Sequence, residues 1–429
     1  MAKQATPRVD CTRDRTTVGA EASRRRRLRG LLCCAAALWL PAGAAQAVVI
    51  NLIDTNGVGG SAAQSALEIA AAYWESILTN DVTINIAVSY TNLSSGALAE
   101  AASTLIDYDV ADWKDGVVAT ASDFLLDQTA VLPTLNEDGG ASLITNGSSA
   151  NRDNDTEVLV YTAGETKSSQ TLYLQTSLVK AIGGDVTYGL DNVAEVDATL
   201  NFNSTTNYDF DPSDGIEDGA YDFIGTAIHE IGHALGFDSG VDSLDATGYP
   251  DGPVTDQSNV NDTSIFSALD MFRYSTDESD VAPGDDPVLD LSVGTKSYFS
   301  IDGGETALYD NSFSTGRYNG DGYQAAHWQD SSGCSSEQGI MNPTSCREQT
   351  SVVTSLDLAA MDAIGWNLDM DVLGEPGYAA SSADIYRQFA TAVPEPATWA
   401  MMLVGFAMLA GGLRRRPKAI QASLAIAPA

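Results

Sequence analysis

The chain contains only three histidines, and two of them lie four residues apart. His229 and His233 enclose Glu230 in the segment His-Glu-Ile-Gly-His, and His327 follows far downstream. Residues four apart project from one face of a helix, so the first two imidazoles can bind one metal ion. Glu230 lies about 100° further round and can reach a water on that ion. The spacing of His229 and His233 predicts metal-assisted hydrolysis with Glu230 as general base, and together with His327 the histidines have the distribution of a three-histidine site for one Zn²⁺.

The residues around this motif have the pattern of a helix that ends at a glycine. Apolar side chains recur at helical spacing from Phe223 to Leu235, and Gly236 supplies a natural stop. A chance match to so short a motif is the alternative. The helical pattern and the single remaining histidine favour the metal site.

The run from His229 to Phe237 resembles the active-site helix and glycine turn of the metzincin zinc peptidases. In the short form of that motif the third ligand follows the glycine by three residues. That position is Ser239 here, and the neighbouring Asp238 is one residue out of place. In the leishmanolysin-like metzincins an insertion displaces the third histidine. The segment Ala-His-Trp around His327 is similar to that arrangement, which implies His327 as the third ligand.

The resemblance also implies a Met-turn, a tight turn that places a methionine beneath the metal as an apolar floor. Met341 occupies that position, and Asn-Pro follows it directly, as is typical of turns. An ordinary core methionine is the alternative. Residues 356–366 form an amphipathic pattern closed by glycine, similar to the C-terminal helix that supports the Met-turn. The implied fold class is α+β and zincin-like, with a mixed twisted sheet, an active-site helix and a lower subdomain.

Other patterns outline the domain that must carry these residues. Alternating or apolar runs predict a helix at 62–78 and strands at 48–54, 82–90, 157–162 and 198–202. We expect one peptidase domain over residues 48–370. Within it, residues 240–326 form an insertion between the second and third ligands, with a packed strand at 270–274. Residues 371–392 are expected to be a linker.

The N-terminus predicts export. Arg24 to Arg29 is basic, Leu31 to Leu40 is apolar, and Ala-Gln-Ala at 45–47 is a cleavage site, so residues 1–47 are typical of a signal peptide. The long polar stretch before Arg24 leaves the true start codon open. The export prediction does not depend on it.

The C-terminus predicts sorting to the cell surface. Pro-Glu-Pro at 394–396 precedes a mostly apolar run from 397 to 413 and then three arginines, the pattern of one transmembrane segment with a basic cytoplasmic end. Residues 393–418 resemble the PEP-CTERM sorting signal of Gram-negative bacteria. The resemblance implies processing by an exosortase and delivery to the cell surface or to an exopolysaccharide matrix. A plain membrane anchor is the alternative.

Between these ends the chain is strongly acidic. Residues 48–392 carry 54 acidic and nine basic side chains, a net charge of −45. Such a field repels nucleic acid, favours solubility and attracts divalent cations or basic substrates. Candidate Ca²⁺ ligands lie in Asp211–Asp222 and at Asp277, Glu278 and Asp280, although no EF-hand or repeat spacing is present. A solvated acidic surface is favoured over a calcium site.

Two cysteines remain outside the leader, Cys334 and Cys346, on either side of Met341. An even pair in an exported domain predicts a disulfide, which would hold the Met-turn loop under the metal. Zinc ligation by these cysteines is the competing idea. The three histidines already complete a hydrolytic site.

Together these features predict a monomeric, exported zinc endopeptidase that acts on protein or peptide substrates. The alternative is a matrix or adhesion protein that keeps zinc for stability and cleaves nothing. Glu230 argues against it, because a purely structural site has no use for a carboxylate there. Hydrolysis of the surrounding exopolysaccharide is disfavoured, since glycoside hydrolysis typically uses paired carboxylates.

Overall fold

The computed structural model describes residues 48–146, 159–189, 195–248, 260–275, 282, 287–330 and 337–391. All of them belong to one compact unit that begins at Ala45. The predicted signal peptide and the predicted transmembrane segment lie outside these residues. Among the helices that are described, none has the length and apolar character needed to cross a membrane.

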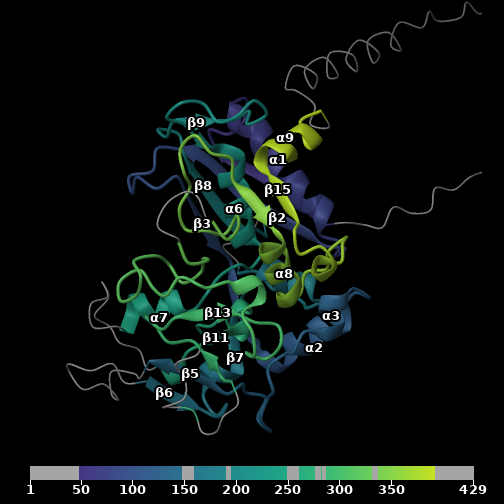
Figure 1. Ribbon diagram of the computed structural model, residues 1–429, viewed down its shortest axis with the longest axis vertical. Helices are drawn as coiled ribbons and strands as arrows, with labels where there is room; N and C mark the ends of the chain where they lie inside the picture. The colour runs from purple at the N-terminus through teal and green to yellow at the C-terminus, as the bar shows by residue number, and fades with distance from the viewer. Residues whose placement is uncertain are drawn as a thin grey trace, which may run out of the picture. The chain divides into compact units, whose positions relative to one another are not determined.

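A four-stranded mixed sheet lies in the upper half of the view in Figure 1. Its order is β1 (Val49–Asn56), β2 (Thr83–Thr91), β8 (Ala198–Asn203) and β3 (Ala99–Ser103). The first three strands are parallel, and β3 pairs antiparallel with β8 at the edge. Predicted strands 48–54, 82–90 and 198–202 match β1, β2 and β8 to within two residues. Alternate residues of β2 enter the core, as the two-residue period of a strand requires: Ile84, Ile86 and Val88.

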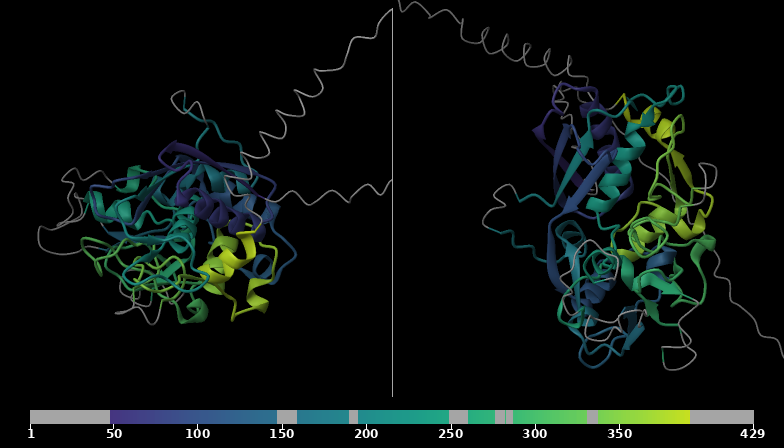
Figure 2. Two further views of the ribbon diagram at one scale, coloured as in Figure 1. Left: turned by 90° about the horizontal axis from the view of Figure 1, so that it is seen from above. Right: turned by 90° about the vertical axis from the view of Figure 1, so that its left-hand side faces the viewer.

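Two helices pack together beneath this sheet. They are α1 (Ala62–Ile77), where a helix at 62–78 was predicted, and α6 (Phe223–Ala234), which carries the histidine motif. The buried Trp74 indole of α1 donates a 3.1 Å hydrogen bond to the Ile228 carbonyl of α6. In the right-hand view of Figure 2, α6 runs between the sheet and the C-terminal elements. The motif helix is therefore held from both sides.

A five-stranded sheet lies in the lower half of the view in Figure 1. It joins strands from before and after the motif helix: β13 (Ser297–Phe299), β11 (Arg273–Ser275), β12 (Leu289–Asp290), β5 (Leu143–Asn146) and β6 (Leu159–Thr162). The pairing of β12 with β5 joins the segment between His233 and His327 to a strand that precedes the motif helix. The interpretation of residues 240–326 as an insertion stays a prediction. The strand predicted at 270–274 is wrong in its first half. Leu269–Phe272 is a 3₁₀ helix, and only the end of the prediction lies in β11.

The remaining described elements are short. Three two-stranded ladders pair β4 (Leu105–Asp109) with β7 (Thr171–Gln175), β9 (Tyr208–Asp209) with β10 (Tyr221–Asp222), and β14 (Val352–Thr354) with β15 (Ala379–Ser381). The other helices are α2 (Val110–Thr120), α3 (Leu125–Thr129), α4 (Lys167–Gln170), α5 (Thr176–Ala181), α7 (Val241–Gly248), α8 (Ser355–Ile364) and α9 (Ser382–Phe389). Single 3₁₀ turns lie at Val260–Asp262, Leu308–Asp310 and Val372–Gly374.

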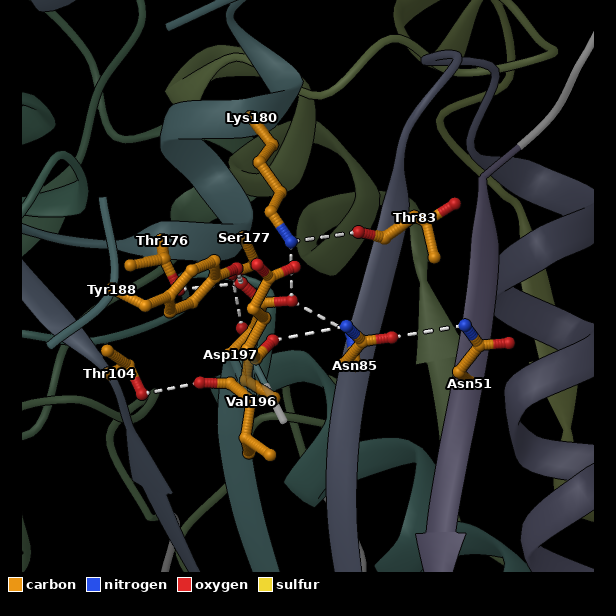
Figure 3. A network of polar contacts seen from close by, with 12 residues as sticks. Asn51, Thr83, Asn85, Thr104, Thr176, Ser177, Lys180, Tyr188, Val196 and Asp197 are labelled. Carbon is orange, nitrogen blue, oxygen red and sulfur yellow. Dashed lines mark hydrogen bonds and ion pairs between the residues drawn. The ribbon is translucent and has the colours of Figure 1, made fainter. Parts of the chain in front are cut away.

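A buried carboxylate ties the parallel sheet to α5 (Figure 3). Asp197, which has no exposed surface, forms a 2.8 Å ion pair with Lys180 of α5. It also accepts hydrogen bonds from the hydroxyls of Thr176 and Tyr188 and from the backbone N–H of Asn85 in β2. A buried charge is tolerated when it is paired and hydrogen-bonded in this way. Asp197 thus ties α5 to the beginnings of β2 and β8 in the four-stranded sheet.

Residues 371–391 are part of the fold, which corrects the prediction of a linker over 371–392. They contain β15, which pairs with β14, and α9, which packs against α1. Ile385 of α9 and Val372 before it are almost completely buried. This burial of apolar surface explains why the segment is folded.

Candidate metal centre

The helix α6 begins and ends at residues that fix its position. Its N-cap Asp222 accepts a 2.9 Å hydrogen bond from the N–H of Gly225 and another of 2.9 Å from the N–H of Ser351. At the other end, Gly236 adopts a φ of +120°, which a residue with a side chain rarely adopts. Ile228 and Ile231 enter the core from this helix, which leaves His229 and His233 on the opposite face.

The structure brings all three predicted histidines together. The Nε2 atom of His233 lies 3.1 Å from Nε2 of His229 and 3.2 Å from Nε2 of His327, and the third separation is 3.3 Å. In the described part of the chain no other group of His, Cys, Asp or Glu residues comes together as closely in sets of three or more. Asp238, the rival third ligand, is not part of this group.

Each of these imidazoles has its other nitrogen against a backbone carbonyl. The Nδ1 atoms of His229, His233 and His327 lie 2.7, 2.6 and 3.2 Å from the carbonyl oxygens of residues 340, 237 and 324. A carbonyl only accepts, so Nδ1 carries the proton and Nε2 of a neutral ring carries a lone pair. Burial lowers the pKa of all three imidazoles, that of His233 to about 3, which keeps the rings neutral.

Three lone pairs that converge in this way fit a zinc ion. Zinc bonds to histidine nitrogen at about 2.0–2.1 Å, and tetrahedral geometry then separates neighbouring nitrogens by about 3.3 Å. The Nε2–Nε2 separations of 3.1–3.3 Å in the structure match this value. Without a cation the lone pairs would repel one another. Histidines that bind metals usually donate the N–H of the other ring nitrogen to such a carbonyl, which fixes the orientation of the ring.

Glu230 lies beside the histidines in the same cleft and is only 7% exposed. No described residue donates a hydrogen bond to its carboxylate. Burial raises the pKa of Glu230 to about 8, and the negative charge of Glu100 on β3 adds to the rise. A carboxyl group with a pKa near the working pH can both accept and donate a proton.

His327 lies outside any helix or strand, and its loop is held by side chains from two other elements. Asp242 of α7 accepts hydrogen bonds of 2.7 and 3.0 Å from the backbone N–H groups of Ala325 and Ala326. The buried Arg273 of β11 donates a 3.2 Å hydrogen bond to the Ala325 carbonyl. Asp242 and Arg273 thus bind the backbone N–H and C=O of Ala325, two residues before His327. Sequence reasoning identified neither Asp242 nor this role of Arg273.

The predicted Met-turn is organised by a buried aspartate of α8 that sequence reasoning missed. Asp357 accepts hydrogen bonds from the backbone N–H groups of Ile340 (2.9 Å) and Met341 (3.2 Å) and from the Trp328 indole (2.8 Å). It also accepts from the N–H and hydroxyl of Thr354, at the start of the helix. The Ile340 carbonyl faces Nδ1 of His229. Asp357, which binds the N–H of Ile340, therefore helps to position the carbonyl that orients this imidazole.

Met341 itself packs under the motif helix. It is 1% exposed, and a Cβ placed on Gly232 would lie 2.7 Å from its sulfur. Only glycine at position 232 therefore allows the methionine this close to the helix. The role of Met341 as the floor of a metal site stays a prediction. The helix predicted at 356–366 is α8, closed by Gly365 with a φ of +129°.

The three histidines and Glu230 line one cleft of about 810 Å³. One wall is β3 with the turn before it, residues 95–103. The other wall contains residues 322–327 and 342–345. No sequence pattern pointed to β3, whose segment Ala-Glu-Ala-Ala-Ser lacks the β-branched and aromatic residues that are typical of strands.

The remaining predicted sites have different outcomes. Cys346 is disulfide-bonded, and its predicted partner Cys334 lies outside the described residues. In the candidate calcium segment Asp211–Asp222, no three carboxylates come together as a ligand set in the described chain. The other calcium candidates, at 277–280, lie outside the described residues.

Comparison with known proteins identifies the C-terminal segment. Residues 392–416 match the PEP-CTERM protein-sorting motif. The chain therefore carries the signal of an exported protein that an exosortase-type enzyme recognises. No curated protein and no solved structure matches the chain.

Proposed function

We propose that this exported protein is a zinc-dependent endopeptidase of the metzincin type, with His229, His233 and His327 as the zinc ligands. One observation carries the proposal: three imidazole lone pairs converge at 3.1–3.3 Å beside the buried carboxylate of Glu230. The mixed sheet above the motif helix and the Met341 turn below it agree with a metzincin fold.

The chemistry follows from the residues around the ligands. A zinc ion held by three imidazoles supplies a Lewis acid for a carbonyl oxygen and lowers the pKa of a bound water. Glu230 takes the proton of the attacking water and returns it to the leaving amine. Burial raises the pKa of Glu230, which helps it to hold the proton until the amine leaves, and the charge of a zinc ion would favour the ionised form that acts as the base. A site that only stabilised the fold would have no use for this buried, unpaired acid.

The shape of the cleft favours an extended polypeptide as substrate. β3 is an edge strand that pairs on one side with β8 and lines the cleft along its length. An edge strand offers free backbone N–H and C=O groups, which can bind a peptide as an added strand. Such binding would lay the peptide across the three histidines.

The proposal is tested by zinc content and casein hydrolysis, measured on one preparation of the full chain. The wild type should contain one zinc and hydrolyse casein. Glu230→Gln should keep the zinc and lose most of the activity, and His327→Ala should lower zinc occupancy. One zinc in a wild-type protein without activity would favour the alternative, a zinc-stabilised matrix protein. Equal activity in wild type and Glu230→Gln would refute the role of Glu230.

A further inference from the structure

A further carboxylate, that of Asp238, lines the cleft that contains the histidines. It follows the glycine turn that ends α6 and lines the same cleft as His233 and His327. It is partly exposed, unlike its neighbours Phe237 and Ser239, which are buried. The geometry excludes it from the metal-ligand group, so its place in the cleft needs another explanation.

Asp238 lacks a cationic partner. Its carboxylate accepts two hydrogen bonds from neutral groups, 2.9 Å from the Gln175 side-chain amide and 2.8 Å from the N–H of Ser239. None of the ion pairs within the described residues includes Asp238. Each carboxylate oxygen can accept more than one hydrogen bond, so both retain acceptor capacity. Burial raises the pKa of Asp238 to about 6, and the group is therefore still ionised at neutral pH.

The surroundings hold Asp238 in place. Its backbone carbonyl accepts a 2.5 Å hydrogen bond from the Ser267 hydroxyl. The next residue, Ser239, donates its hydroxyl to the buried Asp270 at 2.6 Å. The second acceptor beside the carboxylate, Oε1 of Gln175, is buried and has no hydrogen-bond partner. A rigid carboxylate with unused acceptor capacity binds a donor without first having to be ordered.

The other charged residues that line the cleft do not neutralise Asp238. Glu100 on β3 adds negative charge. Arg317, the only Lys or Arg among the described lining residues, is exposed and lies over the ring of Tyr318 at 5.7 Å. The other described charged residues that line the cleft, Glu100 and Glu230, are acidic.

We propose that Asp238 is the specificity residue of this cleft and binds the Lys or Arg side chain of a peptide substrate next to the scissile bond. The inference rests on the proposed peptidase function and adds the substrate class, basic polypeptides. An ammonium or guanidinium group would supply the charged donor that Asp238 lacks. The acidic character of residues 48–392 would attract such substrates toward the cleft.

The test measures binding, so that it does not depend on cleavage. The full chain with Glu230→Gln is titrated with fluorescein-labelled octapeptides of Ala and Gly that carry Lys, norleucine or Glu at each position in turn. At one position Lys should bind about tenfold tighter than norleucine, the gain expected of one charge-assisted hydrogen bond. Adding Asp238→Asn should reduce this ratio to below about twofold. This variant should fold, because rotation of the Gln175 amide can satisfy the new Asn.

Glu100→Gln is the matched control, since it removes the same charge from an exposed position of the same cleft. It should leave most of the preference for Lys. The proposal is overturned if no peptide binds, if no position favours Lys, or if the preference survives Asp238→Asn or disappears with Glu100→Gln. The peptidase proposal fails separately: peptides with Lys would bind, but the wild type would cleave neither them nor casein.

Discussion

Two buried aspartates on the same helix should respond in opposite directions to the same substitution. Asp357 and Asp362 both lie in α8, and their exposed fractions are 0% and 2%. Asp357 accepts five hydrogen bonds, whereas no described residue donates one to the side chain of Asp362, whose Oδ1 is buried. Replacing either by Asn removes the ionisable carboxyl group and keeps the shape of the side chain. The number of donors that face the group then decides whether the free energy of unfolding falls or rises.

Asp357→Asn should lower the free energy of unfolding by about 3 kcal/mol. One carboxylate oxygen serves Met341 and Trp328, and the other serves Ile340 and Thr354. An amide nitrogen cannot accept, so at least two buried donors lose their partner. Each unpartnered donor costs about 1–3 kcal/mol. Part of this sum is offset because burying a neutral amide costs less than burying a carboxylate. The loss would be a large share of a typical stability of about 5–15 kcal/mol.

Asp362→Asn should stabilise the protein, and more so at high pH. Burial raises the pKa of Asp362 from 3.8 to about 8, with smaller contributions from the charges of Asp127 and Asp371. Between these two values the folded protein holds a proton that the unfolded chain has released, so stability falls as pH rises through this window. Each pKa unit corresponds to about 1.4 kcal/mol, so the pKa shift of Asp362 can lower the free energy of unfolding by at most about 6 kcal/mol. Because relaxation of the protein around a buried charge reduces its cost, we expect a gain of about 2 kcal/mol at pH 8 and little near pH 4.

Urea unfolding of the full chain, followed by the fluorescence of its buried tryptophans, measures both effects. The wild type and the two variants are compared at pH 5 and pH 8. Opposite signs at pH 8, with a gain for Asp362→Asn that shrinks at pH 5, are the expected result. Shifts of the same sign, or a gain that is independent of pH, would refute the assignment of these costs to hydrogen bonding and burial.

Three further substitutions test the supports of the site and the sheet. Asp242→Ala frees the backbone before His327 and should weaken zinc binding about 10–100-fold in chelator competition, without removing a ligand; unchanged affinity would contradict the clamp. Gly232→Ala places a methyl group against the sulfur of Met341 and should lower the free energy of unfolding by about 1–3 kcal/mol, although alanine has the better helix propensity. The loss is measured as a lower melting temperature, and a more stable protein would show that the methionine moves aside. Asp197→Asn leaves its lysine partner unpaired and should cost about 3 kcal/mol in urea unfolding, so a loss below about 1 kcal/mol would show that the lysine reaches water instead.

The elements that sequence predicted well are those with short-range signals. The helical spacing of His229 and His233 and the stops at Gly236 and Gly365 are local patterns, and the helices end at those glycines. His327 was proposed as the third ligand through a family resemblance. Spacing alone does not show that a residue 94 positions after His233 lies 3.2 Å from it.

The missed features depend on contacts that are distant in sequence. Asp357 follows Thr354 by three residues, which is a capping-box pattern. Its hydrogen bond from the N–H of Met341 forms only when the turn that contains Met341 packs against α8. The supposed linker contains Ile385 and Phe389 at helical spacing, a signal that the Gly- and Pro-containing stretch before them obscured. Asp242 carries no local signal, because its partners lie more than 80 residues away.

The long separation between the second and third histidines has a consequence for the order of events during export. Closing a loop of 94 residues costs about 4 kcal/mol of chain entropy, which an unfolded chain cannot recover from two imidazoles on a short helix. A chain that crosses the membrane unfolded would therefore not hold the three histidines of the proposed zinc site together. His327 reaches the other two only when the contacts of Asp242 and Arg273 with the loop before it have formed. If the proposed hydrolytic activity exists, it would thus arise only after export, which would protect the proteins of the compartment in which the chain is made.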